Sequence, residues 1–174
     1  MRSGKYSEET KRNNEHVWAS VFVREINKQY GFDYFLEPER GENSPIDMYA
    51  VSQSNKLPTL ELQLTHAVEL QFMAYEQTQD PNYTEKPTID AIERKNEKLQ
   101  RQGEDLSRLI LVIQGYMNHN TANKVFNLAG TFKKYADYDF KGIYYVAPSM
   151  MSADTDESFQ DGYIIPIKDA FQRL

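Results

Sequence analysis

The chain has 174 residues, of which 40% are hydrophobic, contains no cysteine and carries a formal net charge of −6. Its length supports one domain over residues 1–174, and because no apolar run is long enough for a membrane span or a signal peptide, we expect a cytoplasmic protein without a membrane partner. The lack of cysteine excludes disulfides and thiolate-bound metals, and the acidic balance disfavours a broad basic surface for nucleic acid.

The first predicted element is a helix over residues 7–30. Ser7 is a suitable N-cap because its hydroxyl can accept a hydrogen bond from the first turn, and Gly31 is a suitable stop. The apolar stripe recurs at helical spacing and consists of Trp18, Phe22 and Ile26. One side of this helix should therefore pack against the core.

Three strands are expected next, over residues 32–37, 46–52 and 59–65. The third alternates leucine with polar residues, so one of its faces should be core and the other polar. In a hairpin centred near Asn55, Asp47 falls close to opposite Gln63 and diagonal to Glu61. The pattern predicts three polar side chains converging on one face of the sheet.

The rest of the chain is predicted to alternate helices with strands. The expected helices are residues 88–102, capped by Thr88, and 118–138, and the expected strands are residues 109–113, 142–147 and 163–167. Residues 66–79 fit either a helix or a continuation of the preceding strand, residues 80–87 and 151–161 fit loops, and the chain should end in a turn of helix. This order predicts an α/β fold with one mixed sheet and helices on its faces.

The polar face formed by Asp47, Glu61 and Gln63 is the candidate site. Carboxylates on neighbouring strands can share a hard divalent cation, with water filling the remaining positions. Such a cation would activate a water molecule and offset the charge that builds on a phosphate. The alternative is an ordinary solvated hairpin face, since alternating polar residues are common in antiparallel strands.

The stretch between Glu15 and Ile113 resembles the PD-(D/E)xK nuclease superfamily. The resemblance rests on Pro45-Ile46-Asp47 in one predicted strand and Glu61-Leu62-Gln63 in the next, followed by a helix and a buried strand. It implies the restriction-endonuclease-like fold, in which an αβββαβ core forms a mixed central sheet flanked by helices.

The resemblance also implies roles for individual residues. Asp47 and Glu61 match the metal ligands of the family, with Mg²⁺ or Mn²⁺ as the cofactor. Gln63 stands where the family usually has lysine, and it can orient the attacking water without supplying charge. Glu15 is the candidate acidic residue of the first helix, where it would assist the metal, and Glu25 is the alternative.

Lys95 is a further candidate because it interrupts an apolar stripe. The stripe of the predicted helix consists of Ile89, Ile92, Lys95 and Leu99. Lys95 either replaces the missing family lysine and stabilises the phosphate during catalysis, or buries its stem and extends its amine to solvent.

The leading functional expectation is magnesium-dependent hydrolysis of phosphodiester bonds, with DNA as the expected partner. The alternative is a non-catalytic module that binds protein or nucleic acid on the same fold, such as an immunity protein or a phage interaction protein. The net negative charge and the glutamine at the lysine position favour this alternative. A homodimer, or a separate specificity subunit, would supply the recognition surface that the short chain lacks.

Overall fold

The computed structural model describes residues 8–37, 46–66, 77, 82–115, 138–148 and 162–171. Within these residues the helices are α1 (Glu8–Tyr30) and α3 (Asn82–Arg101). The strands are β1 (Tyr34–Glu37), β2 (Met48–Ser52), β3 (Leu60–His66), β4 (Leu109–Gln114), β5 (Gly142–Pro148) and β6 (Gly162–Lys168), and the short 3₁₀ turn η1 (Leu106–Arg108) precedes β4. Each described strand lies close to its predicted place.

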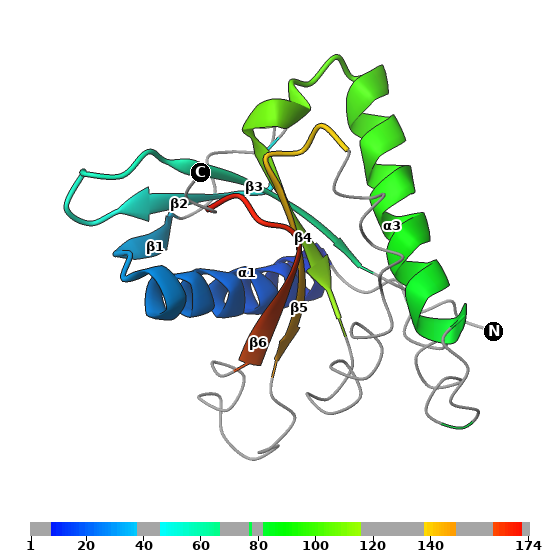
Figure 1. The fold of residues 1–174 in the computed structure, drawn as a ribbon, viewed down its shortest axis with the longest axis horizontal. Coiled ribbons are helices and arrows are strands. Elements are labelled where there is room, and N and C mark those ends of the chain that lie inside the picture. Colours follow the sequence, from blue (N-terminus) through cyan, green and yellow to red (C-terminus); the bar gives the residue numbers. More distant parts are fainter. Residues whose placement is uncertain are drawn as a thin grey trace.

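The strands form one six-stranded sheet in the order β1-β2-β3-β4-β5-β6. The pairs β1–β2, β2–β3 and β5–β6 are antiparallel, whereas β3–β4 and β4–β5 are parallel. Figure 1 shows α1 lying across the sheet and α3 standing beside its other face. The protein is therefore an α/β fold with a mixed sheet and helices on both faces, as predicted from the order of elements.

The hairpin of β2 and β3 has the predicted register. Met48 pairs with Leu62 and Tyr49 with Glu61, which is the pairing expected for a turn centred near Asn55. Asn55 has a φ of 56°, a left-handed conformation that asparagine tolerates better than most residues. The turn chemistry and the alternating pattern therefore select the same register.

Asp33, which precedes β1, ties this strand to the start of the turn. Its carboxylate accepts hydrogen bonds from the Ser52 hydroxyl at 2.6 Å and from the Ser54 backbone N–H at 2.8 Å. These two hydrogen bonds favour the ionised form and lower the pKa of Asp33. The edge strand β1 is thus held in place by side-chain contacts as well as by its ladder with β2.

The first face of the sheet packs against α1. The buried stripe of α1 includes Phe22 and Ile26, both fully buried, and they meet residues of the central strands such as Leu62 and Tyr144. Trp18 lies at the margin of this core, where its indole N–H donates to the Gly115 carbonyl at 3.2 Å. The predicted stripe of the first helix is therefore the face that it buries.

The second face packs against α3. Ile92 and Leu99 of the helix are buried against Leu111 and Ile113 of β4 and Tyr145 of β5. Every residue of β4 is buried because this strand has a neighbour on each side and a helix over each face. The fully apolar run over residues 109–113 is therefore a strand buried on both faces, as predicted.

The predicted start of the second helix is wrong. Helix α3 begins at Asn82, so Thr88 lies inside it and is fully buried rather than acting as a cap. Pro87 removes one backbone donor in the second turn, where the buried residues that follow offset the loss. Of the segment predicted to end in a turn of helix, residues 169–171 are not helical, and residues 172–174 lie outside the described ranges.

Asp169 holds the segment after β6 against the rest of the molecule. One carboxylate oxygen accepts from the Tyr30 hydroxyl at 2.8 Å, and the other accepts from the Tyr144 hydroxyl at 2.9 Å and from the Phe171 backbone N–H at 2.9 Å. The Phe171 ring packs against Phe32 with centroids 5.2 Å apart. We call this arrangement of Asp169, Tyr30, Tyr144 and Phe171 the C-terminal clamp.

Some expectations fall on residues outside the described ranges. They are most of the segment 66–79, the predicted helix over residues 118–138 and the predicted loop over residues 151–161. No helix within the described ranges is long and apolar enough to cross a membrane.

Candidate functional site

The structure brings three of the predicted site residues to one face of the sheet. Tyr49 pairs with Glu61, and the same register places Asp47 opposite Gln63 at the next position. Residues at alternate positions of paired strands share a face, and this face is the one over which α3 lies. The predicted convergence of Asp47, Glu61 and Gln63 is therefore present.

Asp47 is held by contacts with β3 and α3. Its Oδ2 atom accepts a hydrogen bond from the Leu64 backbone N–H at 2.7 Å and lies 3.3 Å from Lys95 Nζ. The Lys95 amine also donates to the Leu64 carbonyl at 3.0 Å, and its side chain is only 14% exposed. Lys95 therefore turns inward to the site face and does not extend to solvent.

Glu61 is paired with a cation from another element. Its Oε2 atom is buried, lies 3.7 Å from Arg108 Nε and accepts no hydrogen bond from the described residues. Arg108 is also 3.9 Å from Asp105 and is 56% exposed. The Glu61 carboxylate thus lies at the edge of the covered part of the sheet, where Arg108 balances its charge.

Of the other two predicted residues, Gln63 shares the face of the two carboxylates, whereas Glu15 does not. Gln63 is only 1% exposed, so it lies beneath the layer of α3 and not at the surface. Glu15 lies half-buried on α1, the helix that packs on the opposite face of the sheet. Glu25, the alternative to Glu15, forms an ion pair with Lys28 at 3.4 Å on the same helix.

The oxygen donors of Asp47 and Glu61 have the chemistry that a hard divalent cation prefers. In this structure each carboxylate already has a side-chain cation beside it, Lys95 for Asp47 and Arg108 for Glu61. Within the described ranges no group of three or more histidine, aspartate or glutamate side chains is placed to hold a metal. The binding of Mg²⁺ or Mn²⁺ at this face stays a prediction.

Arg108 was not among the residues that the sequence pattern selected. It lies next to Leu109, and the parallel pairing of β3 with β4 sets Leu109 opposite Glu61. An arginine directly before a buried strand is a signal for a side chain at the edge of the sheet. The residue that this arginine contacts can be named only when the neighbouring strand is known.

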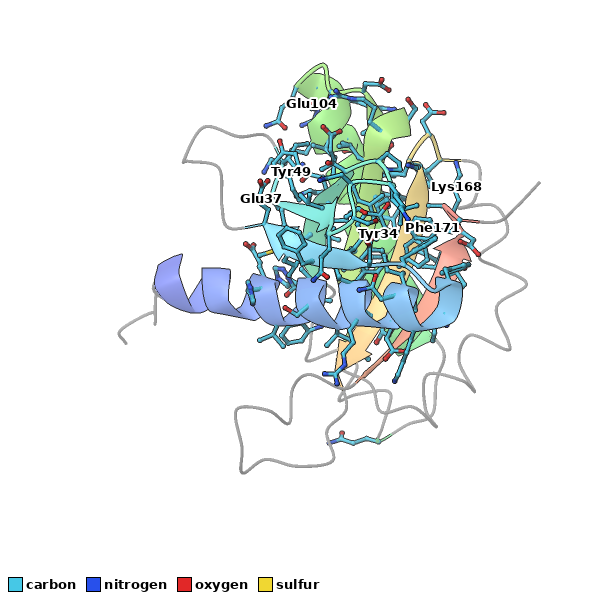
Figure 2. The ribbon with its side chains drawn as sticks, turned by 90° about the vertical axis from the view of Figure 1, so that its left-hand side faces the viewer. Tyr34, Glu37, Tyr49, Glu104, Lys168 and Phe171 are labelled. Atoms are coloured by element: carbon cyan, nitrogen blue, oxygen red, sulfur yellow. The ribbon has the colours of Figure 1, made fainter. Side chains whose placement is uncertain are left out.

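The same face continues past the carboxylates onto β1 and β2. Phe35 pairs with Val51, Glu37 with Tyr49, and Tyr49 in turn with Glu61. Phe35 is 41% exposed, whereas Tyr49 and Glu37 are half-buried. Figure 2 shows Glu37 and Tyr49 near each other, well away from Lys168 and Phe171. An aromatic surface therefore borders the carboxylates.

Comparison with known families decides the class of the protein. A family model described as a carbohydrate binding domain (family 17/28) matches residues 4–127, which is more than two thirds of the 174-residue chain. The matched residues include α1, the strands β1 to β4 and α3. The chain belongs to this family. The chain has no significant match among the curated proteins or among the solved structures.

This match corrects the family inferred from the short motifs. The protein is not identified as a PD-(D/E)xK nuclease, and the expectations of endonuclease activity, phosphodiester hydrolysis and a DNA partner are overturned with that identification. The immunity or phage interaction module and the nucleic-acid-binding alternative are likewise unsupported. The physical reason is that an acidic residue opposite an acidic-x-polar triplet is a common hairpin pattern, so it is a weak discriminator.

The family match does not bear on the positions of the predicted site residues or on their roles. Asp47 and Glu61 share one face, as their spacing predicted, and Lys95 contacts Asp47 there, which is one of the two alternatives that its place in the helical stripe left open. The assignment of a functional role to Asp47, Glu61, Gln63 and Lys95 stays a prediction.

Proposed function

We propose that this protein binds carbohydrate through non-covalent contacts. The observation that carries the proposal is the match of the carbohydrate binding domain model over residues 4–127. This stretch contains both described helices and the first four strands, including the hairpin that bears Asp47 and Glu61. Carbohydrate therefore replaces nucleic acid as the proposed ligand.

The chemistry of the described surface supports this proposal. Sugar rings have apolar C–H faces that pack against aromatic side chains, and hydroxyl groups that need hydrogen-bonding partners around the edge. Phe35 is an exposed aromatic ring on the sheet, and the carboxylate of Glu61 and the guanidinium of Arg108 lie along the same face. Such a combination can hold a sugar without a deep cavity.

We also propose, for the fold alone, that the core has the restriction-endonuclease-like arrangement. The succession α1, β1, β2, β3, α3, β4 along the chain and the order β1-β2-β3-β4 within the sheet support it. A fold can carry unrelated functions, so this proposal says nothing about the ligand. An experimental structure whose core strands pair in another order would contradict it.

The proposed function is tested by offering the full chain a panel of polysaccharides in native affinity gels. We expect at least one polysaccharide to retard the protein, because a binding protein exchanges on and off the immobile chain. Calorimetry with soluble oligosaccharides of that polysaccharide should then give a saturable heat. A gel without polysaccharide is the control. If the panel covers neutral, amino, uronate and sulfated glycans and none retards the folded protein, the proposed function is wrong.

A further inference from the structure

We propose that Asn27 of α1 blocks the outer edge of β1, and that without this block the edge pairs with β1 of a second copy of the chain. In the sheet that the described residues form, β1 is the last strand at one side and β6 at the other. An edge strand presents backbone N–H and C=O groups on its outer side, and these groups can add a strand from another molecule. Here the added strand would be an identical β1 in antiparallel direction.

The hydrogen-bond pattern of β1 identifies the backbone groups that face outward. The Gln53 backbone N–H donates to the Asp33 carbonyl at 3.1 Å, so the backbone groups of Asp33 point toward the neighbouring chain of β2. The direction of these groups alternates along a strand, so those of Phe35 point toward β2 as well. The N–H and C=O groups of Tyr34 and Leu36 therefore project from the outer edge.

Asn27 occupies the position that an added strand would take. Its side-chain amide donates to the Tyr34 carbonyl at 2.8 Å, and its side-chain oxygen accepts from the Tyr34 N–H at 3.0 Å. A residue opposite Tyr34 in an antiparallel pair would form these same two hydrogen bonds. Figure 1 shows β1 beside the end of α1, the helix that carries Asn27. The Asn27 amide and an added strand therefore exclude each other, since both need the same donor and acceptor.

The outer edge of β1 is complementary to itself about Phe35. When Phe35 faces Phe35 of a second copy, Tyr34 of each copy faces Leu36 of the other, because antiparallel strands run in opposite directions. The outward groups of Tyr34 and Leu36 would then exchange hydrogen bonds on both sides of the central pair. The two Phe35 residues would form a pair without hydrogen bonds, in which side chains approach most closely. Phe35 is 41% exposed in the single chain, so pairing would bury two exposed rings against each other.

The two edge strands of the sheet differ in their protection against pairing. Strand β6 contains the exposed Pro166, which has no N–H and interrupts any ladder on that side. The sequence of β1 contains neither proline nor lysine, the residues that most often protect an edge. The hydrogen bonds of Asn27 supply that protection instead. Each copy also carries a formal net charge of −6, so salt should strengthen any pairing by screening the repulsion between copies.

Sedimentation velocity over a range of protein concentrations tests this proposal on the full chain. The wild type should sediment as the 20.3 kDa monomer, and Asn27→Ala should form a dimer of twice that mass. Its association constant should be about a hundredfold higher than that of the wild type, because each copy no longer has two hydrogen bonds to break. Alanine favours helix, so α1 should be retained. Adding Phe35→Lys to Asn27→Ala should restore the monomer, since it sets two like charges opposite each other at the centre.

Gln29→Ala, which removes an amide from an exposed position of the same helix, is the matched control and should remain monomeric. Circular dichroism and the melting temperature verify that each variant is folded. Asn27→Asp keeps the acceptor for the Tyr34 N–H but cannot donate to the Tyr34 carbonyl, so it should also dimerise and serves if Asn27→Ala does not fold. A folded cap variant that stays monomeric at every concentration would overturn the proposal, as would a wild type that dimerises equally strongly. Dimers of the double variant, or growth beyond the dimer, would show that the copies meet elsewhere than at β1.

Discussion

The pair formed by Lys95 and Asp47 shows how one side chain links a helix to the polar face of the sheet. Lysine is costly to bury unless its amine is compensated, and here the amine has both a carboxylate at 3.3 Å and the Leu64 carbonyl at 3.0 Å. Nearby, Arg94 donates to the His66 carbonyl at 3.1 Å. Two consecutive basic residues of α3 thereby anchor the helix on β3.

We expect Lys95→Met to lower the free energy of unfolding by about 1–3 kcal/mol, because it leaves Asp47 and the Leu64 carbonyl without this donor. Urea unfolding of the wild type, Lys95→Met, Asp47→Asn and the double variant measures it. A coupling of about 0.5–3 kcal/mol between the two sites is expected for residues in direct contact. Additive single effects would show that the ion pair contributes nothing. Lys98→Met, on an exposed position of the same helix, is the matched control.

At this residue scale the sequence identified Lys95 but overlooked Arg108. Lys95 stands out because it breaks an apolar helical stripe, which is a local pattern. Arg108 approaches Glu61 only because β4 pairs in parallel with β3, forty-odd residues away in the chain. A contact of that kind depends on the sheet topology, which local spacing does not encode.

At the scale of elements, the C-terminal clamp joins three separate parts of the chain. Tyr30 ends α1, Tyr144 lies in β5 and Asp169 follows β6. Burial, together with the hydrogen bond to Asp169 and its charge, raises the pKa of Tyr30 to about 12. Burial, as the largest cause, also raises the pKa of Tyr144. Both hydroxyls therefore keep their protons, and their hydrogen bonds to Asp169, above the pH at which a free tyrosine ionises.

We expect the free energy of unfolding to fall as pH rises through the window from about 10 to about 12. The folded pKa of Tyr30 lies above the unfolded value of 10.0, so the folded state holds this proton more tightly. The stabilisation is complete below pH 10 and is lost as pH approaches 12. Urea unfolding at stepped pH measures the effect.

The matched variant for this prediction is Tyr30→Phe, which keeps the ring and removes the ionising group. It should be less stable at neutral pH by about 1 kcal/mol, because the hydrogen bond to Asp169 is lost. Its stability should also decline less steeply between pH 10 and pH 12. Parallel declines in the two proteins would mean that Tyr30 does not contribute to the alkaline sensitivity.

At the scale of the whole molecule, one sheet carries both the carboxylate pair and the exposed Phe35 ring. The carboxylates of Asp47 and Glu61 lie where α3 begins to cover the sheet, whereas Phe35 lies on the exposed edge strand β1. The two features are linked through β2, which pairs with both β1 and β3.

Binding of a divalent cation would stabilise the whole folded molecule, and we predict this for Asp47 and Glu61. A cation that binds only the folded state raises its stability by about 2.7 kcal/mol when present at a hundredfold excess over its dissociation constant. Thermal unfolding with increasing Mn²⁺ or Mg²⁺ should therefore show a rising melting temperature. The rise should disappear in Glu61→Gln and Asp47→Asn. A melting temperature that is independent of millimolar metal would contradict the prediction, and Ca²⁺ tests whether the effect is selective.

The sequence by itself determined the type and order of the described elements and the register of the β2–β3 hairpin. These features follow from local periodicity and turn chemistry, as the alternation of Leu60 to Leu64 and the turn at Asn55 show. Helix α3 starts at Asn82, before the predicted start at Thr88, because the packing of the helix on the sheet outweighs the cost of Pro87 within it. The tertiary structure alone decided that Arg108 reaches Glu61 and that Phe35 stays uncovered, because both depend on which strands and helices become neighbours.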